Sequence, residues 1–220
     1  MNLAIFDLDH TLINCDSSSE WSNFLHEKGI FSDADMQRHQ AFDQDYRKGC
    51  LDLDAYLAFV LRPLAEYSRA ELDEMHREFT AEFIAPHISD MARMLVEGHR
   101  AAGDELLVIS STNEFIITPI CKIFGIDNVI GTQLETDADG NYTGNYTGIP
   151  SLKEGKITRL HQWLAERGQN QADYEKVYFY SDSRNDLPLL EQVNQPVAVN
   201  PDPVLTLTAA QRGWPILDFV

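Results

Sequence analysis

Two aspartates stand two positions apart near the start of the chain, in the segment Phe6-Asp7-Leu8-Asp9-His10-Thr11-Leu12. They follow a short apolar run, and because a strand repeats every two residues, both carboxylates are expected on the same side. Close carboxylates divide labour: one stays ionised beside a metal and acts as a nucleophile, while the other has a raised pKa and donates a proton. An aspartate pair is also typical of a helix cap. The two residues alone leave both interpretations open.

A cluster of hydroxyl and amide groups follows a second apolar run, at residues 106–109. Its members are Ser110, Ser111, Thr112 and Asn113. If that run is a strand of an open α/β sheet, these groups lie at the carboxyl edge of the sheet, where the ligands of such folds bind. They are donors suited to an anionic ligand.

Two further groups could complete a phosphate site. Gly155-Lys156 opens an amphipathic segment, which puts an ammonium near the positive end of a helix, although a lone Lys on a helix is ordinarily solvated. After the apolar run 177–180, Asp182 and Asp186 supply the hard oxygen ligands that Mg²⁺ prefers. The sequence therefore predicts Mg²⁺ as a cofactor.

The elements that must position these groups alternate between strand and helix. Buried parallel strands are expected at residues 3–6, 106–109, 129–130, 177–180 and 197–199. Amphipathic helices are expected between the last four, with apolar faces Ile116/Ile120/Ile123, Ile157/Leu160/Leu164 and Leu187/Leu190. The predicted fold class is α/β, with a doubly wound, mainly parallel sheet.

Residues 16–84 contain no strand pattern but several amphipathic helices. We predict that they form a helical cap inserted into a catalytic core of residues 1–15 and 85–220. Pro86 and a helix with Ile88, Met91 and Leu95, ending near Gly103, are expected to return the chain to the sheet. Turn residues mixed with Tyr and Thr at 135–150 predict a hairpin protruding from the sheet.

The composition limits the classes of molecule that the protein is expected to bind. The 220 residues carry 35 acidic and 17 basic side chains, a formal charge of -18, which repels nucleic acid and anionic membranes. A small phosphorylated metabolite is the expected partner, with no nucleic acid and no membrane, and the chain is expected to be a monomer or homodimer. Three isolated cysteines, Cys15, Cys50 and Cys121, and the lack of a signal or transmembrane pattern predict a cytoplasmic protein.

Four motifs, taken in order, resemble those of the haloacid dehalogenase superfamily over nearly the whole chain: Asp-x-Asp-x-Thr, a strand followed by Ser, a Lys, and Asp-x-x-x-Asp. The helical cap directly after the first motif is similar to the phosphoserine-phosphatase-like branch. The resemblance implies that Asp7 forms an aspartyl-phosphate, that Asp9 is the general acid and then the base, and that Lys156 neutralises the phosphoryl group. It also favours phosphoester hydrolysis over dehalogenation or ion pumping, because Asp9 supplies a leaving-group acid.

The remaining site residues are carried over from the same resemblance. Mg²⁺ would be held by the carboxylates of Asp7 and Asp182 and by the backbone carbonyl of Asp9, with Asp186 orienting metal-bound water. Ser181 stands where the family usually has Gly, a mild change whose expected effect is to crowd the metal loop. Thr11 is expected to fix the first loop, and the groups assigned to the substrate are Thr11, Asp16, Ser110, Ser111 and Asn185.

The substrate is expected to be a small amino-alcohol or amino-acid phosphate. Phosphoserine phosphatases bind the substrate ammonium with an acid seven positions after the second catalytic Asp, a register that gives Asp16. The candidates for their carboxylate-binding cap arginine, Arg47 and Arg62, fall in no clear register, which favours histidinol phosphate over phosphoserine. Another small phosphometabolite and a receiver-like signalling protein phosphorylated on Asp are the alternatives, although the motif order disfavours the receiver.

Overall fold

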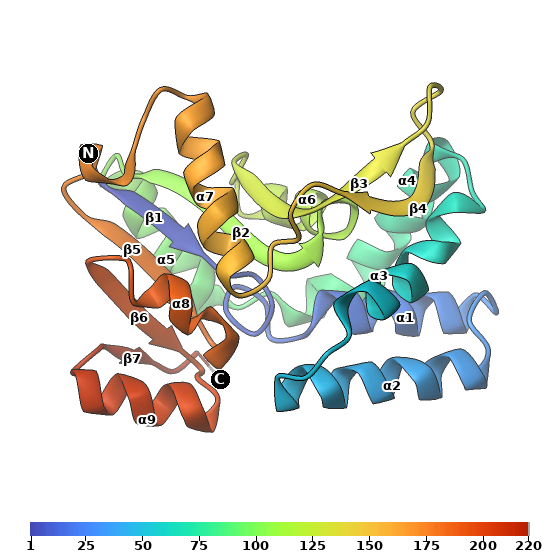
Figure 1. Ribbon diagram of the computed structural model, residues 1–220, viewed down its shortest axis with the longest axis horizontal. Helices are drawn as coiled ribbons and strands as arrows, with labels where there is room; N and C mark the ends of the chain where they lie inside the picture. The colour runs from blue at the N-terminus through green and yellow to red at the C-terminus, as the bar shows by residue number, and fades with distance from the viewer. Residues whose placement is uncertain (220) are drawn as a thin grey trace. The chain divides into compact units, whose positions relative to one another are not determined.

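The computed structural model describes residues 1–219 and divides into two compact units (Figure 1). The first unit contains Met1–Cys15, His87–Thr132 and the chain from Ile149 onward. The second contains Asp16–Pro86 and Gln133–Gly148. The chain thus crosses between units four times, whereas the sequence-based boundary placed residues 133–148 with the catalytic core.

The sheet has seven strands in the order β4-β3-β2-β1-β5-β6-β7, and every pairing is parallel except that of β3 with β4. The predicted α/β fold with a mainly parallel sheet is confirmed. The strands are β1 (Leu3–Phe6), β2 (Glu105–Asn113), β3 (Val129–Thr136), β4 (Tyr142–Thr147), β5 (Val177–Ser181), β6 (Gln195–Val199) and β7 (Ile216–Leu217).

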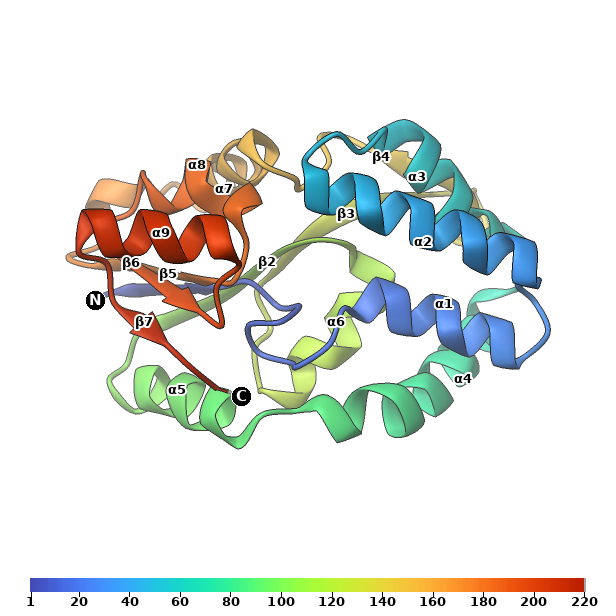
Figure 2. The same ribbon diagram turned by 90° about the horizontal axis from the view of Figure 1, so that it is seen from below.

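Helices cover both faces of the sheet in the first unit. The chain moves outward from β1 through β2 to β3, then returns to β5 on the other side of β1 and moves outward again. Right-handed crossovers therefore place α5 and α6 on one face and α7, α8 and α9 on the other, as Figure 2 shows. The helices are α5 (Asp90–Ala101), α6 (Glu114–Ile123), α7 (Glu154–Glu166), α8 (Leu187–Leu190) and α9 (Pro203–Arg212), with short turns η4 (Gln171–Asp173) and η5 (Arg184–Asp186). The short turn η3 (Ala85–His87) contains the boundary at which the chain passes from the second unit to the first.

The direction of winding reverses at β1, which makes the carboxyl ends of β1 and β5 a topological switch point where ligands bind in such sheets. Phe6 pairs with Tyr180 and with Val108, so Asp7 follows β1 at the level where β5 reaches Ser181. The apolar interior beneath this edge includes Ile5, Ile109, Leu160 and Phe179. A buried sheet thus presents the acid-bearing loops.

One predicted helical face is wrong in register. The helix after Pro86 is α5, which is capped by Ser89 and buries Ala92 and Val96. Met91, which was expected on the apolar face, is 49% exposed. The helix turns its small and β-branched residues inward because they allow close approach to β2.

The second unit is helical, as predicted for residues 16–84, with an aromatic interior. Trp21 packs against Phe24 and Phe79, with ring centroids 5.2 and 5.1 Å apart. A π-helical turn, residues Thr80–Ile84, brings the ring centroids of Phe83 and Phe24 to 5.6 Å apart. Its elements are α1 (Ser17–Glu27), α2 (Asp33–Lys48), α3 (Leu53–Leu61), η1 (Arg62–Ala65), α4 (Arg69–Phe79) and η2 (Thr80–Ile84).

The predicted hairpin forms, but it packs on these helices rather than protruding freely. The Tyr146 hydroxyl donates to Asp54 Oδ1 at 2.7 Å, and the Arg69 guanidinium lies 4.1 Å from the Tyr142 ring centroid. Polar side chains on β4 therefore serve as packing partners within the second unit. Over residues 1–219, none of the helices combines the length and apolar character needed to cross a membrane.

Candidate active site

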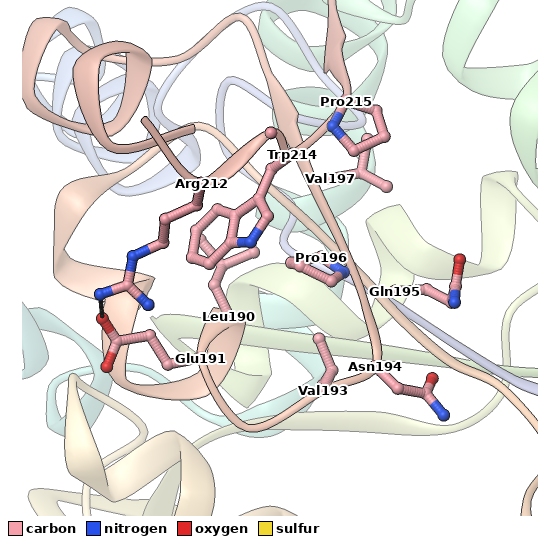
Figure 3. Close-up of a pocket in the computed structure, with 11 residues that line it drawn as sticks. Leu190, Glu191, Val193, Asn194, Gln195, Pro196, Val197, Arg212, Trp214 and Pro215 are labelled. Carbon is pink, nitrogen blue, oxygen red and sulfur yellow. Dashed lines mark ion pairs between the residues drawn. The ribbon is translucent and has the colours of Figure 1, made fainter. Parts of the chain in front are cut away.

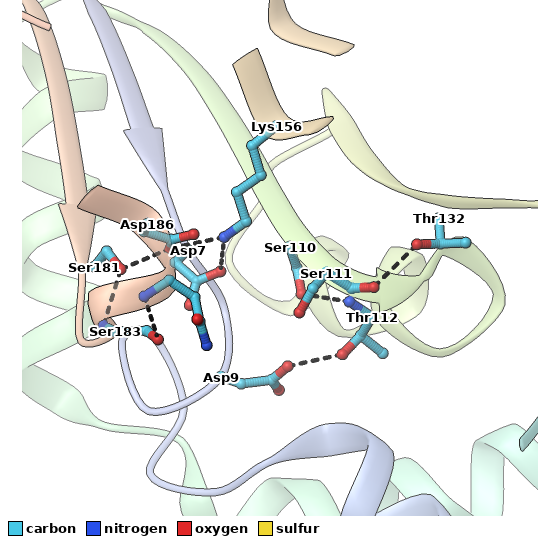
Figure 4. Close-up of polar contacts among 11 residues, drawn as sticks. Asp7, Asp9, Ser110, Ser111, Thr112, Thr132, Lys156, Ser181, Ser183 and Asp186 are labelled. Carbon is cyan, nitrogen blue, oxygen red and sulfur yellow. Dashed lines mark hydrogen bonds and ion pairs between the residues drawn. The ribbon is translucent and has the colours of Figure 1, made fainter. Parts of the chain in front are cut away.

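A buried ammonium joins two of the expected acidic residues. Lys156 Nζ donates to Asp7 Oδ1 at 2.9 Å and to Asp186 Oδ2 at 2.7 Å (Figure 4). The three side chains are only 3%, 9% and 2% exposed, respectively. Most lysines on helices are solvated, but Lys156 is buried. Its two carboxylate partners offset the cost of burying its charge.

The start of α7 is built to deliver this lysine. Lys153 precedes the helix with φ 52° and ψ -122°, a conformation that non-glycine residues rarely adopt. At Gly155, an added Cβ would lie 2.1 Å from the Pro150 carbonyl oxygen, so no larger residue fits without moving the backbone. Strain of this kind persists where the surrounding structure over-determines it, often at functional sites.

The second acidic loop carries its own support. Ser181 Oγ donates to Asp186 Oδ2 at 2.7 Å and accepts from the Ser183 backbone N–H at 3.2 Å. The expectation that Ser181 would crowd the loop is replaced by a hydrogen-bonding role. Asn185 is buried in the same turn, and its backbone N–H donates to Ser183 Oγ at 3.2 Å.

The carboxylates of this site outnumber its cations. Burial raises the pKa of Asp7 to about 7, and repulsion from Asp186 and Asp9 adds to the rise while Lys156 opposes it. Burial, with repulsion from Asp7 and Asp186, also raises the pKa of Asp182 well above its ordinary value. Strongly perturbed acids at the carboxyl edge of a sheet mark a candidate functional site.

Asp9 has a different set of neighbours. Its Oδ2 accepts a hydrogen bond from Thr112 Oγ1 at 2.9 Å, and the Thr112 backbone N–H donates to Ser110 Oγ at 3.1 Å. Burial, together with the charge of Asp9, raises the pKa of the Cys121 thiol, which disfavours its reactive thiolate form. Sequence analysis placed Thr112 in the hydroxyl cluster but did not assign it to the site.

The loop between the two aspartates and the next helix is a tight turn. The Leu8 carbonyl accepts from the backbone N–H groups of Thr11 and Leu12, and His10 has a left-handed φ of 55°. The Thr11 hydroxyl is buried with no hydrogen-bond partner among the described residues, so the backbone, and not this hydroxyl, fixes the loop. The helix-cap alternative for Asp7 and Asp9 is wrong, because the residue that caps α1 is Asp16.

Two expected site residues, Asp16 and Ser111, and one further member of the hydroxyl and amide cluster, Asn113, make structural hydrogen bonds. Asp16 belongs to the second unit, where its Oδ1 accepts from the Ser19 backbone N–H at 2.7 Å. Asn113 caps α6 by accepting from the Ile116 N–H at 3.2 Å, and the Ser111 carbonyl accepts from Thr132 Oγ1 at 3.0 Å. The hydroxyl cluster also lies within β2, not after it.

The donor set fits a hydrated Mg²⁺ ion. Within residues 1–219, no three His, Cys, Asp or Glu side chains are grouped to hold a metal, so the four aspartates expected as ligands do not form a cage. Mg²⁺ usually takes only one or two carboxylates, keeps several waters and shares oxygens with a phosphate. Excess buried negative charge around Asp7 and Asp182 suits that mode of binding.

Comparison with known proteins supports the same conclusion. A family model described as haloacid dehalogenase-like hydrolase matches residues 4–191. A histidinol-phosphatase of Neisseria meningitidis serogroup C is 64% identical over 219 residues, which is 99% of either protein. A phosphoserine phosphatase of Mycobacterium tuberculosis is 30% identical over 98% of this chain and 70% of its own length.

Solved structures agree in fold. A Bordetella pertussis protein of unknown function has a TM-score of 0.93 and 42% identity, covering 100% of this chain and 99% of that one. A phosphoserine phosphatase solved as a phospho-aspartyl intermediate analogue has a TM-score of 0.68 at 18% identity, covering 99% of this chain and 93% of its own, and therefore speaks only for the fold. The expected superfamily and the expected phosphatase class are confirmed. The chain belongs to the haloacid dehalogenase-like hydrolase family, and within it to the phosphatases.

Proposed function

We propose that this chain is a Mg²⁺-dependent phosphatase whose substrate is histidinol phosphate. The observation that carries the substrate is the 64% identity, over 99% of both proteins, with the histidinol-phosphatase of Neisseria meningitidis. An amino-alcohol phosphate also agrees with the lack of a cap arginine in a clear register for a substrate carboxylate. The chemistry rests on the Asp7, Asp9 and Lys156 arrangement.

In the proposed reaction, an Asp7 carboxylate oxygen attacks phosphorus and the bond from phosphorus to the substrate oxygen breaks. Asp9 gives its proton to the departing alkoxide, which leaves as the alcohol. Asp9 then takes a proton from water as the water oxygen attacks the aspartyl-phosphate, which releases inorganic phosphate and restores Asp7. Lys156 stabilises the charge on the transferring group, and Ser110 is proposed to donate to it.

Phosphatases of this family are generally Mg²⁺-dependent. The carboxylates of Asp7 and Asp182 and the backbone carbonyl of Asp9 would hold the ion, and Asp186 would help to hold it. When bound, the ion supplies positive charge that screens the nucleophile from the phosphate dianion. The raised pKa of Asp7, caused first by burial, supports the need for that charge, since the nucleophile must be ionised.

Asp16 is proposed to bind the substrate ammonium, as its position seven residues after Asp9 suggests, with Thr11, Ser111 and Asn185 as further substrate contacts. Asp16 already accepts the Ser19 N–H through one oxygen, which holds its carboxylate in place. We further propose that the protein works in the cytoplasm, as its three isolated cysteines, Cys15, Cys50 and Cys121, which lack CxxC spacing, suggest.

Phosphoserine is the second candidate substrate, favoured by the 30% identity with the Mycobacterium tuberculosis phosphoserine phosphatase. A site that lacks the partner for a substrate carboxylate would discriminate against it, because a buried carboxylate left unpaired is costly. A receiver-like protein would keep a phosphorylated Asp7 without turnover.

The test is phosphate release from histidinol phosphate, phosphoserine, sugar phosphates and nucleotides, each with Mg²⁺ and with EDTA. We expect the highest kcat/KM for histidinol phosphate and loss of activity in EDTA. A preference for a sugar phosphate would contradict the assignment of an amino-alcohol phosphate as the substrate. A preference for phosphoserine would establish phosphoserine as the substrate instead. Stable labelling of Asp7 without release of phosphate would establish the receiver-like alternative.

A further inference from the structure

The residue that follows β6 bridges two distant parts of the first unit. Asn200 Nδ2 donates to the His10 carbonyl at 3.1 Å, across 190 positions of sequence. Its Oδ1 accepts from the Phe219 N–H at 2.7 Å, and its own N–H donates to the Leu217 carbonyl at 2.9 Å. One side-chain amide thus ties the loop that carries Asp9 to the C-terminal segment.

Both residues joined by this bond have unusual backbones. His10 has φ 55° and Asn200 has φ 43°, in the left-handed region that non-glycine residues visit mostly as Asn or Asp. Such conformations cost free energy and persist only where neighbouring contacts enforce them. The bond from Asn200 is a contact of this kind for the turn directly after Asp9.

The same short segment also holds the other acidic loop. The Asp202 N–H donates to the Asp182 carbonyl at 2.8 Å, and Asp202 Oδ2 accepts from the Arg184 N–H at 2.7 Å. Asp202 Oδ1 accepts from the N–H groups at the start of α9, which anchors it. Between the two anchors lies Pro201, whose fixed φ leaves little freedom. Residues 200–202 therefore span the loops after β1 and β5.

We propose that Asn200 is a positioning residue for the reaction: by donating to the His10 carbonyl, it sets the turn that aims Asp9 at the leaving group. This inference rests on the proposed phosphatase activity. Because Asn200 bonds the His10 carbonyl and would act through that backbone group, its loss should affect kcat more than KM. Displacing a catalytic group by about 1 Å can cost on the order of 100-fold in rate.

The chain offers a matched control at the other end of the same strand. Asn194 directly precedes β6, beside a pocket of about 420 Å³ at the amino edge of the sheet (Figure 3). Its Nδ2 donates to the Glu175 carbonyl at 3.2 Å, and its Oδ1 accepts from the Val177 N–H at 2.8 Å. Asn194 therefore makes the same two kinds of bond as Asn200, away from the acidic loops.

Three variants separate positioning from stability. Asn200→Asp keeps an acceptor for the Phe219 N–H but cannot donate to the His10 carbonyl, while Asn200→Gly loses both bonds and relieves the left-handed strain. Asn194→Ala removes the matched pair of bonds. We expect kcat for histidinol phosphate to fall about 10- to 100-fold in both Asn200 variants, with KM changed less than about twofold, and kcat in Asn194→Ala to stay within about twofold of wild type.

A second readout does not need turnover. Amide hydrogen exchange in the peptide covering residues 8–13 should quicken in the Asn200 variants and stay unchanged in Asn194→Ala, in the protein without Mg²⁺. If Asn200→Asp keeps full kcat and the exchange of residues 8–13, the inference is wrong. If kcat instead follows melting temperature across all three variants, Asn200 is merely structural. Wild type that releases no phosphate from any substrate would overturn the proposed function, and the exchange result would still decide the role of Asn200.

Discussion

Asp7 and Asp9 are the same residue type two positions apart, yet the structure surrounds them differently. The Asp7 cluster consists of Asp7, Lys156, Asp186 and Ser181; all four side chains are buried and joined by hydrogen bonds, and three of them are ionisable. The Asp9 cluster consists of Asp9, Thr112 and Ser110: the neutral Thr112 hydroxyl donates to Asp9, and the Thr112 N–H donates to the Ser110 hydroxyl. The local sequence around the two aspartates hardly distinguishes them. The proposed division into nucleophile and acid therefore depends on partners from strands and helices that are distant in the sequence.

Removing the Asp7 carboxylate should give the largest effect. We expect Asp7→Asn to lower kcat at least about 10⁴-fold while the protein stays folded, because an amide replaces the carboxylate proposed to form the acyl-phosphate bond. Phosphate release and circular dichroism would check both parts. Asp43→Asn, at a half-exposed position in the second unit, is the control. Retained turnover in Asp7→Asn would refute the nucleophile assignment.

The same variant tests the electrostatics in the absence of Mg²⁺. Burial raises the pKa of Asp7 from 3.8 to about 7, so the folded state holds this proton more tightly than the unfolded chain does. The stability that this group contributes is complete below about pH 4 and is lost as pH rises through about 7. We therefore expect a higher melting temperature for Asp7→Asn than for wild type at pH 8 in EDTA, and a smaller difference at pH 5. If Asp7→Asn and wild type have equal melting temperatures at both pH values, burial does not raise the pKa of Asp7.

Lys156→Met should break the Asp7 cluster next most strongly. It leaves two buried carboxylates without their cation, a change that typically costs about 3–5 kcal/mol of folding free energy and here should weigh more at pH 8 than at pH 5. The rate should fall about 10³-fold, since a charge that stabilises the transferring group is lost. Denaturant unfolding and kcat would be measured beside Lys122→Met, an exposed lysine on α6. A Lys156→Met protein as stable as the control would contradict the pairing.

Thr112→Val tests the Asp9 cluster while keeping the side-chain shape. The variant loses the 2.9 Å bond to Asp9, and we expect kcat to fall about tenfold with KM nearly unchanged, because only the orientation of the acid is affected. Thr208→Val, which loses a 2.9 Å bond to the Val204 carbonyl on α9, is the control. If both variants keep wild-type kcat, the hydroxyl does not orient Asp9.

Sequence reasoning found the strands and the charged groups because both have strong local signals. The run of residues 3–6 is β1 in full, and the acids after it follow from spacing. The sequence did not predict the supporting contacts of Thr112, Asn200 and Asp202. These residues form hydrogen bonds to residues more than a dozen positions away, and no local pattern encodes such a pairing. The predicted boundary kept residues 133–148 in the core, whereas they group with the second unit, since Tyr and Thr on a strand do not show which surface they will cover.

Ser181→Gly should give the smallest effect and decides between two views of the Asp7 cluster. If the Ser181 hydroxyl supports Asp186 through its 2.7 Å bond, restoring the usual glycine of the family should lower kcat/KM about two- to fivefold, the order expected for one hydrogen bond of about 1 kcal/mol. Ser181→Ala separates the hydroxyl from backbone freedom, because alanine avoids the extra entropy cost of glycine in a strand. Equal losses in the two variants would assign the effect to the hydroxyl. A glycine variant faster than wild type would mean instead that Ser181 crowds the loop, and that the Asp7 cluster holds its charges at some cost to the rate.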